Sequence, residues 1–430
     1  MKKIYITLIA LLSASILFAQ TPVPAKKQSK SIVLMGATAH LGDGTVIENA
    51  AIGFKDGTFN LIADARTIRL ASDAYDTIIN LNGKHVYPGL IAANTVLGIR
   101  EIGAVRATSD HREVGGVNPS ARSLIAYSTD SRVTPTVRYN GVMLAEVTPQ
   151  GGLVSGSSSV MKLDGWNYED AILKSDIGIH VNWPRMRVRD AWWAPKPEVQ
   201  RKRTAENLAQ LHQLFNDAYS YYKTDNKKQA NQHFEAMNGL FDGSKKLFVH
   251  ADYIKEIISA VNFANKYQIK LVIVGGTDAL MASDLLKENN VPVVLEDIHR
   301  VPSRTDQDID MPYRLPALLK EAGVEFCVSA PGFWQVRNLP FHAGTTAAYG
   351  LTKEEALQTI TAWPAKILGI DDVCGTLTEN KQATLIVSSG DVLDMRTSVI
   401  EMAFIQGMEL DLVSIQTEMN EKFLGKFGLE

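Results

Sequence analysis

The chain has 430 residues, 45% of them hydrophobic, and a formal net charge of −3 at pH 7. At about 100–200 residues per domain, this length predicts two or three structural units, one of which can be a barrel. The slightly negative balance provides no broad basic surface that would follow phosphates, so the composition argues against nucleic acid as a partner.

The N-terminus has the pattern of a secretory signal. Lys2 and Lys3 precede the apolar run "IYITLIALLSASILF", and "FAQ" offers a cleavage point after Ala19. We therefore expect residues 1–19 to be removed, residues 20–30 to form a flexible lead, and the mature protein to be periplasmic without a membrane span. A retained anchor is the alternative, although the run is short for a span of about 20 residues.

The two cysteines, Cys327 and Cys374, cannot form a framework of several disulfides. One lies in an apolar, strand-like run and the other in a turn. We expect both to be buried free thiols.

The order of strand and helix patterns along the chain predicts the architecture. Residues 31–86 have short apolar runs separated by tight-turn signals such as Asp56-Gly57, which is typical of a small β-layer. Residues 87–372 alternate β-branched runs with helices of about 12 to 16 residues, which predicts βαβ units and a parallel sheet. Residues 373–430 return to a strand pattern, and we expect the two β-rich ends to pair.

Residues 197–243 interrupt this alternation with two amphipathic helical stretches. Their length predicts an insertion beside the barrel. Their Tyr and Phe residues recur at helical spacing, which favours core packing over an aromatic ligand site.

Several segments carry a resemblance to a known family. They are "LNGKHVYPGLI", "VHADYIKEI", "IVGGTDALMASDLLKENNVPVVL", and "GLTKEEALQTIT" leading into "GTLTENKQATLIV". Over almost its whole mature length the chain resembles the amidohydrolase superfamily, in its imidazolonepropionase-like branch. The resemblance implies an α/β fold: a distorted (β/α)8 TIM-like barrel plus a composite β-sandwich formed by both chain ends. It also implies one or two divalent metals at the C-terminal face of the barrel, activating a water molecule.

The resemblance places the metal-ligand positions of the family on Asn94, Val96, His250, Gly275 and Ala330, the last shared with the adjacent Ser329. Val, Gly and Ala have no donor atom, and an Asn carbonyl oxygen binds borderline metals weakly. A catalytic zinc requires roughly three imidazole or carboxylate ligands. We therefore predict that the metal site is mostly replaced, and that zinc or another divalent metal binds only if the site has been rearranged.

The loop that follows "VPVVLED" concentrates further polar groups. Glu296, Asp297 and His299 are followed by three alternating acidic residues at 306, 308 and 310. A Ca²⁺ site is one reading, but "TDQDID" lacks the Gly and the terminal Glu of a calcium loop. The other reading is a solvated acidic loop that pairs with arginines at 300, 304 or 314.

Five residues are predicted to line a pocket at the strand ends: Asn94, His180, His250, His299 and Arg337. Trp183, Trp334 and His342 lie in the same segments, where packing without a ligand is an equal reading. The Gly-rich run "VTPQGGLVSGSSSV" has neither the spacing of a P-loop nor that of a nucleophile elbow, which argues against nucleotide binding and against a serine hydrolase site.

Three hypotheses follow for function. The sequence favours a degenerate amidohydrolase that binds a small-molecule ligand, or that serves an active paralogue as its non-catalytic subunit, in a homo- or hetero-oligomer. The alternative is an active hydrolase on C–N bonds of a cyclic amide or a related substrate, with His250, His299 and Asp297 as candidate catalytic residues. A purely structural protein is the third.

Overall fold

The structure is a computed structural model that describes residues 23–71, 73–225, 229–302 and 304–429. The predicted signal, residues 1–19, lies outside these described residues. Within them, none of the helices combines the length and the apolarity that crossing a bilayer requires.

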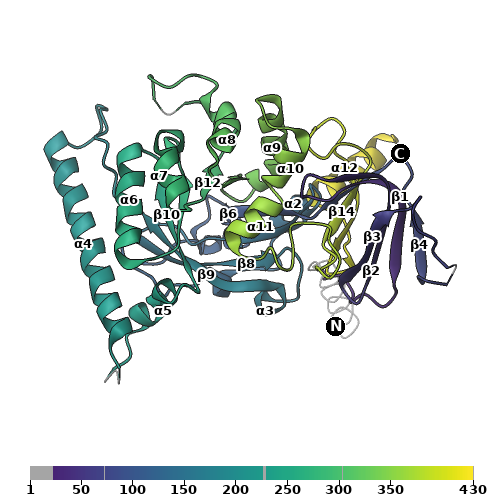
Figure 1. Cartoon of the computed structure of the whole chain (residues 1–430), viewed down its shortest axis with the longest axis horizontal. Coiled ribbons are helices and arrows are strands. Elements are labelled where there is room, and N and C mark those ends of the chain that lie inside the picture. The colour runs from purple at the N-terminus through teal and green to yellow at the C-terminus, as the bar shows by residue number, and fades with distance from the viewer. Residues whose placement is uncertain (1–22, 72, 226–228, 303, 430) are drawn as a thin grey trace, which may run out of the picture.

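One eight-stranded sheet forms the distorted barrel (Figure 1). Its strands, in chain order, are β6 (Leu90–Thr95), β7 (Val142–Val147), β8 (Val154–Lys162), β9 (Ile172–Asn182), β10 (Lys246–Ala251), β11 (Leu271–Gly275), β12 (Val293–Glu296) and β13 (Phe326–Ser329). Spatial order follows chain order from β6 to β13. The strands from β9 to β13 are parallel, as the sequence predicts.

The barrel departs from an all-parallel sheet at β8, which runs antiparallel to both β7 and β9. The first and last strands of the sheet are also joined indirectly. The Ile91 N–H donates to Ile360 O at 2.9 Å and the Val328 N–H donates to Thr359 O at 3.0 Å. The segment 359–360 therefore bridges the first and last strands.

Helices cover the outside of the barrel. They are α2 (Val133–Arg138), α3 (Tyr168–Ala171), α6 (Ile254–Tyr267), α7 (Ser283–Glu288), α8 (Met311–Ala322), α9 (Leu339–Ala348), α10 (Lys353–Gln358) and α11 (Ala362–Leu368). Local signals set their ends: Thr352 and Glu355 form a capping box at the start of α10, and Gly323 terminates α8 with a φ of 75°.

The insertion forms α4 (Pro197–Lys223) and α5 (Gln232–Phe241), at the end of the molecule opposite the sandwich (Figure 1). Buried residues of α4 recur at positions 211, 215 and 218, on one helical face. The Phe215 ring meets the ring of Phe263 edge-on, with centroids 4.8 Å apart, and also contacts Tyr267. The predicted packing role of these aromatic residues is confirmed.

The second sheet is the composite sandwich layer. The N-terminal part supplies β1 (Ile32–His40), β2 (Val46–Lys55), β3 (Thr58–Asp64), β4 (Thr77–Asn80) and β5 (His85–Pro88), and the C-terminal part supplies β14 (Leu385–Ser388), β15 (Ile400–Ile405) and β16 (Met408–Glu409). The predicted pairing of the two chain ends is made by β14, which runs antiparallel to β5.

Two segments differ from the expectation for the ends of the chain. The C-terminal part is not entirely β, because a Ser414 cap starts a final helix, α12 (Ile415–Phe427). Residues 23–30, the described part of the predicted flexible lead, form hydrogen bonds with other parts of the chain. The Ala25 N–H donates to Asp164 Oδ2 at 3.0 Å, and the Gln28 side chain accepts from Gly57 N–H at 2.8 Å. Cys327 and Cys374 are buried free thiols, as predicted.

Candidate functional site

A fully buried carboxyl group is the centre of a polar network inside the barrel. Glu146, on β7, accepts from the Asn94 backbone N–H at 3.0 Å and from Ser158 Oγ at 2.8 Å. His180 Nε2 lies 3.3 Å from the same carboxyl and 2.9 Å from Ser158 Oγ. Strands β6, β7, β8 and β9 each contribute one group, so the network joins four neighbouring strands.

The network continues to the next strand through two histidines. His180 Nδ1 and His250 Nε2 are 3.0 Å apart. Because the carboxyl and hydroxyl oxygens at 146 and 158 favour a proton on His180 Nε2, we assign His180 Nδ1 as the acceptor and His250 Nε2 as the donor. That assignment leaves the lone pair on His250 Nδ1. Burial, with a smaller contribution from His180, lowers the pKa of His250 to about 3, so its ring is neutral near pH 7.

A second hydrogen bond connects the side chains of two strands that are not neighbours in the sheet. The Asn94 Nδ2 amide donates to Glu296 Oε1, linking the end of β6 to the end of β12. Burial is the main cause that raises the pKa of Glu296 to about 7, and the neighbouring charge of Asp252 adds to the increase. Asn94 has a left-handed backbone with φ of 51°. Glu296 is only half-buried, so it is the member of this pair that solvent reaches.

Gly275 lies at the ligand position that the resemblance predicts for the sixth strand, and a side chain there would crowd its surroundings. Its φ is 97°, and an added Cβ would lie 2.9 Å from Asp252 Oδ1. The Asp252 carboxylate is held there by Thr277, whose hydroxyl donates at 2.6 Å. Arg300 donates in turn to Thr277 Oγ1 at 3.2 Å. The space that a histidine would need at 275 is therefore next to an ordered carboxylate.

The remaining ligand positions offer no donor. Val96 and Ala330 are buried hydrophobic residues. The hydroxyl of Ser329, next to Ala330, donates to Ala93 O at 2.6 Å. In the described part of the chain, no three His, Cys, Asp or Glu side chains are grouped so that they could hold a metal ion. The residues at the five positions do not fit the metal of the family, because His250 is the only one with a strong ligand atom.

The candidates that follow β12 form a separate group. His299 Nε2 lies 2.6 Å from Thr345 Oγ1, and its ring stacks on His342 with centroids 4.2 Å apart. Asp297, in a left-handed conformation with φ of 47°, lies 3.9 Å from His342 Nδ1. His299 and Asp297 thus contact α9, whereas His250 contacts His180, so the structure does not join the three candidate catalytic residues through hydrogen bonds.

Arginine side chains form ion pairs with acidic residues of this loop and next to it. Arg304 pairs with Asp278, whose Oδ2 lies 2.7 Å from Arg304 Nη1, and also with Asp306 at 3.1 Å. Arg314 lies 3.7 Å from Asp310. The reading of this loop as acidic side chains paired with arginines is therefore supported for two of the three arginines.

Arg337 belongs to the segment after β13. Its Nη1 donates to the Trp334 carbonyl at 2.9 Å, and its guanidinium lies over the Trp334 ring at 5.9 Å. These local contacts explain its position without a ligand.

The residue that the sequence interpretation missed is Glu146. Its signal is a single acidic residue within the apolar strand run "VMLAEV", where a charge is costly unless it has partners. Ser158 was hidden in a serine-rich run. Their partners come from strands distant in sequence, so only the fold brings them together.

Some buried polar side-chain atoms near the strand ends have no hydrogen-bond partner in the described protein. Among the described residues, the buried atoms in this state include Asn94 Oδ1, Thr148 Oγ1 and Trp183 Nε1, which lie at or just beyond the carboxyl ends of β6, β7 and β9. Buried polar groups are nearly always hydrogen-bonded. Bound water or a polar group of a ligand would satisfy each of these atoms.

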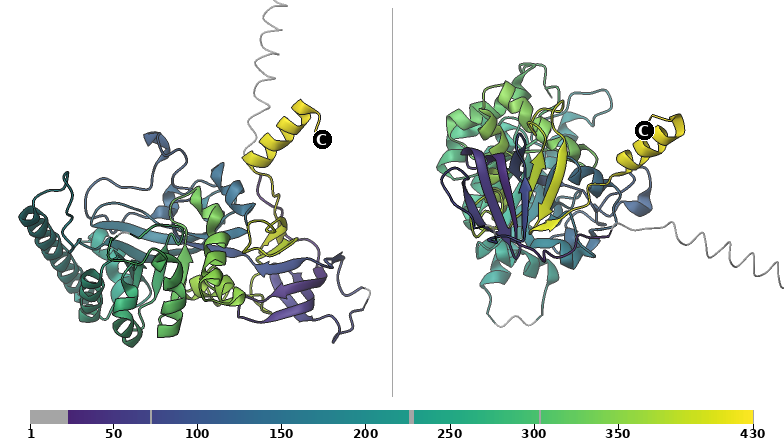
Figure 2. Two further views of the ribbon diagram at one scale, coloured as in Figure 1. Left: turned by 90° about the horizontal axis from the view of Figure 1, so that it is seen from above. Right: turned by 90° about the vertical axis from the view of Figure 1, so that its right-hand side faces the viewer.

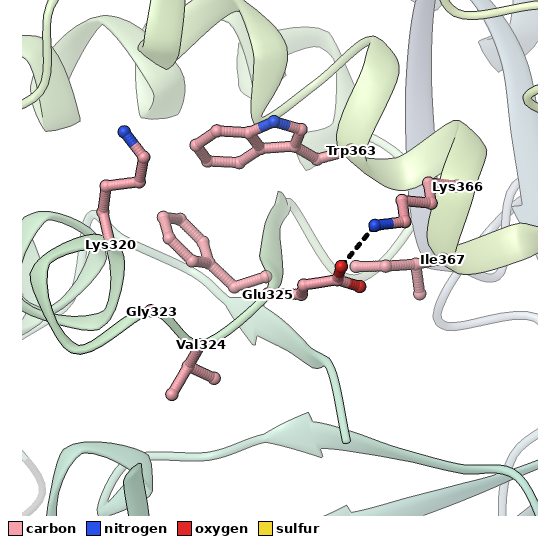
Figure 3. A pocket seen from close by; sticks show the side chains of 8 residues that line it. Lys320, Gly323, Val324, Glu325, Trp363, Lys366 and Ile367 are labelled. Carbon is pink, nitrogen blue, oxygen red and sulfur yellow. Dashed lines mark hydrogen bonds and ion pairs between the residues drawn. The ribbon is translucent and has the colours of Figure 1, made fainter. Parts of the chain in front are cut away.

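A cavity of about 260 Å³ lies at the other end of the barrel (Figure 3). Phe326 at the start of β13 and Trp363 on α11 form its aromatic wall, with ring centroids 5.0 Å apart. An ion pair between Lys366 and Glu325 closes one side. Because the catalytic groups of such barrels lie at the carboxyl ends of the strands, this cavity is separate from the polar network.

Comparison with known proteins concerns the fold. No family model matches the chain, and no curated protein matches it. An amidohydrolase from Thermotoga maritima MSB8 matches with a TM-score of 0.77 and 22% identity, over 88% of this chain and 99% of that one. Molinate hydrolase matches with a TM-score of 0.54 and 13% identity, over 91% and 96% of the two chains. Ochratoxinase from A. niger matches with 0.52 and 12%, over 88% and 95%. The chain has the fold of the amidohydrolases.

Proposed function

We propose that the chain is an exported member of the amidohydrolase superfamily that has exchanged the metal site for a hydrogen-bonded network and that binds a small polar molecule without hydrolysing it. It acts as a ligand-binding protein or as the non-catalytic partner of an active paralogue. The observation that carries this proposal is the joint state of the five ligand positions. Four lack a strong ligand atom, and the fifth, His250, directs Nε2 at His180.

The retained polarity of the barrel mouth supports ligand binding rather than a purely structural role. Asn94 and Asp297 both hold a left-handed backbone at the ends of their strands, and such strain is concentrated at functional sites. The buried, unpartnered atoms of Asn94, Thr148 and Trp183 provide both acceptors and donors. A ligand with hydrogen-bonding groups on several sides fits this set.

The test is metal content measured together with activity. The purified protein is offered zinc, manganese and iron in turn and is then assayed on a panel of cyclic amides and dipeptides. We expect metal well below one ion per chain, no turnover, and the same metal content in His250→Ala as in the control His233→Ala, which removes an exposed histidine on α5. One ion per chain that is lost only in His250→Ala would overturn the proposal.

Ligand binding is measured on the same protein by thermal shift against a library of small polar compounds. A compound that stabilises the wild type should stabilise Asn94→Ala less, because this change removes the amide that lies against Glu296. If no compound stabilises the wild type, the ligand-binding part of the proposal fails while the metal result still stands.

A second candidate function is a hydrolase acting on C–N bonds without the metal of the family. Glu296 favours it, because a half-buried carboxyl group with a pKa of about 7 can donate or accept a proton near neutral pH. His250 is the neighbouring imidazole, but its pKa of about 3 makes it a weak base, so Glu296 would carry the proton transfer. Turnover on the cyclic amide panel that is abolished by Glu296→Gln would establish this function in place of the first.

A further inference from the structure

Helix α12 leaves the body of the protein with its apolar side chains exposed. Figure 2 shows it projecting beyond the sandwich in both views. None of its residues is buried. Met419 is 51% exposed, Phe423 50% and Phe427 65%. Single exposed apolar residues are ordinary, but several on one helix mark an interaction surface.

The spacing of these residues puts them on one face. Positions 415, 419, 423 and 427 are four apart, and side chains at this spacing are neighbours on a helix. Glu418, Lys422 and Lys426 form the adjacent row, three residues after each of the first three members. The apolar row is thus bordered by charges that change from acidic near the start of the helix to basic near its end.

The hydrogen bond and the ion pair that α12 makes with other parts of the described chain both lie in its first turns. Thr136 Oγ1 donates to Gln416 Oε1 at 2.7 Å, and Arg132 lies 3.8 Å from Glu418. A helix of 13 residues is marginal in water unless it packs an apolar face against something. The half of α12 that carries Phe423 and Phe427 is without such packing in the described part of the chain.

We propose that α12 is a dimerisation helix that packs antiparallel against α12 of a second copy of this chain. The charge pattern selects this occupant. In an antiparallel pair, the acidic end of the charged row faces the basic end of the same row in the partner, so Glu418 meets Lys422 or Lys426 of the other copy. The surface is therefore complementary to itself, which a two-fold dimer requires. In a parallel pair, like charges would face each other.

The experiment measures the mass of the purified chain by light scattering over a range of concentrations. We expect about twice the mass of one purified chain for the wild type. Phe423→Glu should raise the dissociation constant by about 30-fold or more, because it removes a central aromatic anchor. Met281→Glu, which places the same charge on an exposed apolar site of the barrel, should leave the dimer intact.

Charge reversal tests the antiparallel geometry and the identity of the occupant. Glu418→Lys makes the charged row entirely basic, and Lys422→Glu with Lys426→Glu makes it entirely acidic, so each variant alone should be monomeric at concentrations where the wild type is a dimer. An equimolar mixture should dimerise again. Circular dichroism spectra and melting temperatures equal to those of the wild type, measured at concentrations where the wild type is also monomeric, exclude misfolding as the cause.

Three results would overturn the proposal. The first is a wild-type chain that stays monomeric at all concentrations, which would mean that another protein or another surface covers the helix. The second is a dimer that Phe423→Glu leaves unchanged. The third is a pair of charge variants that fail to associate when mixed.

Discussion

Replacing Glu146 with Ala is the sharpest test of the polar network as a structural unit. The side chain is completely buried and accepts from the Asn94 N–H and the Ser158 hydroxyl, with His180 Nε2 in reach at 3.3 Å. Alanine removes the acceptor and leaves these donors inside the barrel. Because Asn94 and His180 lead to Glu296 and His250, the change disturbs every histidine and carboxyl of the proposed site.

The magnitude follows from the lost partners. Each buried donor left without an acceptor costs about 1–3 kcal/mol, and Ser158 and His180 can recover part of this by bonding to each other, since they are already 2.9 Å apart. With about two donors left unpaired, the free energy of unfolding should therefore fall by about 2–6 kcal/mol. Glu146→Gln keeps the shape and one acceptor oxygen, so its loss should be about half as large.

Urea unfolding followed by intrinsic fluorescence measures these differences. Glu288→Ala, an exposed residue on α7, is the matched control and should change the free energy of unfolding by no more than about 0.5 kcal/mol. If Glu146→Ala were as mild as this control, the carboxyl would not be an obligatory acceptor, and the description of the barrel interior as one connected network would be wrong.

Three further changes test other parts of the structure. Glu296 has a pKa raised to about 7, so the folded state favours its protonated form, and its contribution to stability is lost as pH rises from about 4.5 to 7; Glu296→Gln should remove this loss and be more stable than the wild type by about 3 kcal/mol at pH 8 but not at pH 4.5, by urea titration. Gly275→Ala should cost about 2–4 kcal/mol, because its Cβ meets Asp252 in a left-handed backbone, while Gly116→Ala, with open space around it, should be nearly neutral in the same assay. Phe215→Ala should lower the free energy of unfolding by about 3–5 kcal/mol by removing the buried ring that attaches the insertion to the barrel, and an unchanged urea midpoint would contradict that packing.

Much of the fold could be predicted because its signals are local. Alternating strand and helix patterns in the second half, the capping box at Thr352, and the amphipathic rows of the insertion each lie within a few residues. The antiparallel course of β8 could not be predicted in this way, because strand direction depends on partners that lie at a distance in sequence. The sequence patterns also missed α12. Its apolar residues are four apart, and this spacing fits one face of a strand as well as one face of a helix.

For the site, single residues were easier to predict than their relations. Asn94, His180 and His250 were expected at the strand ends, and the structure places all three in the network. His180 is completely buried, whereas His299 faces α9. These positions depend on side-chain direction and on the course of the loop. Glu146 could have been suspected as a lone charge in an apolar strand, but its partners on other strands could not.

Under the proposed exchange of the metal site, the predicted ligand positions would be difficult to refill one residue at a time. Burial and the charge of Asp252 already raise the pKa of Glu296, so a further negative charge is unfavourable at this end of the barrel. Restoring one further carboxylate at Ala330 would add another buried negative charge next to the strand that carries Glu296. Restoring a histidine at Gly275 would collide with Asp252. Under the proposal, each single substitution is therefore unfavourable before the others are present.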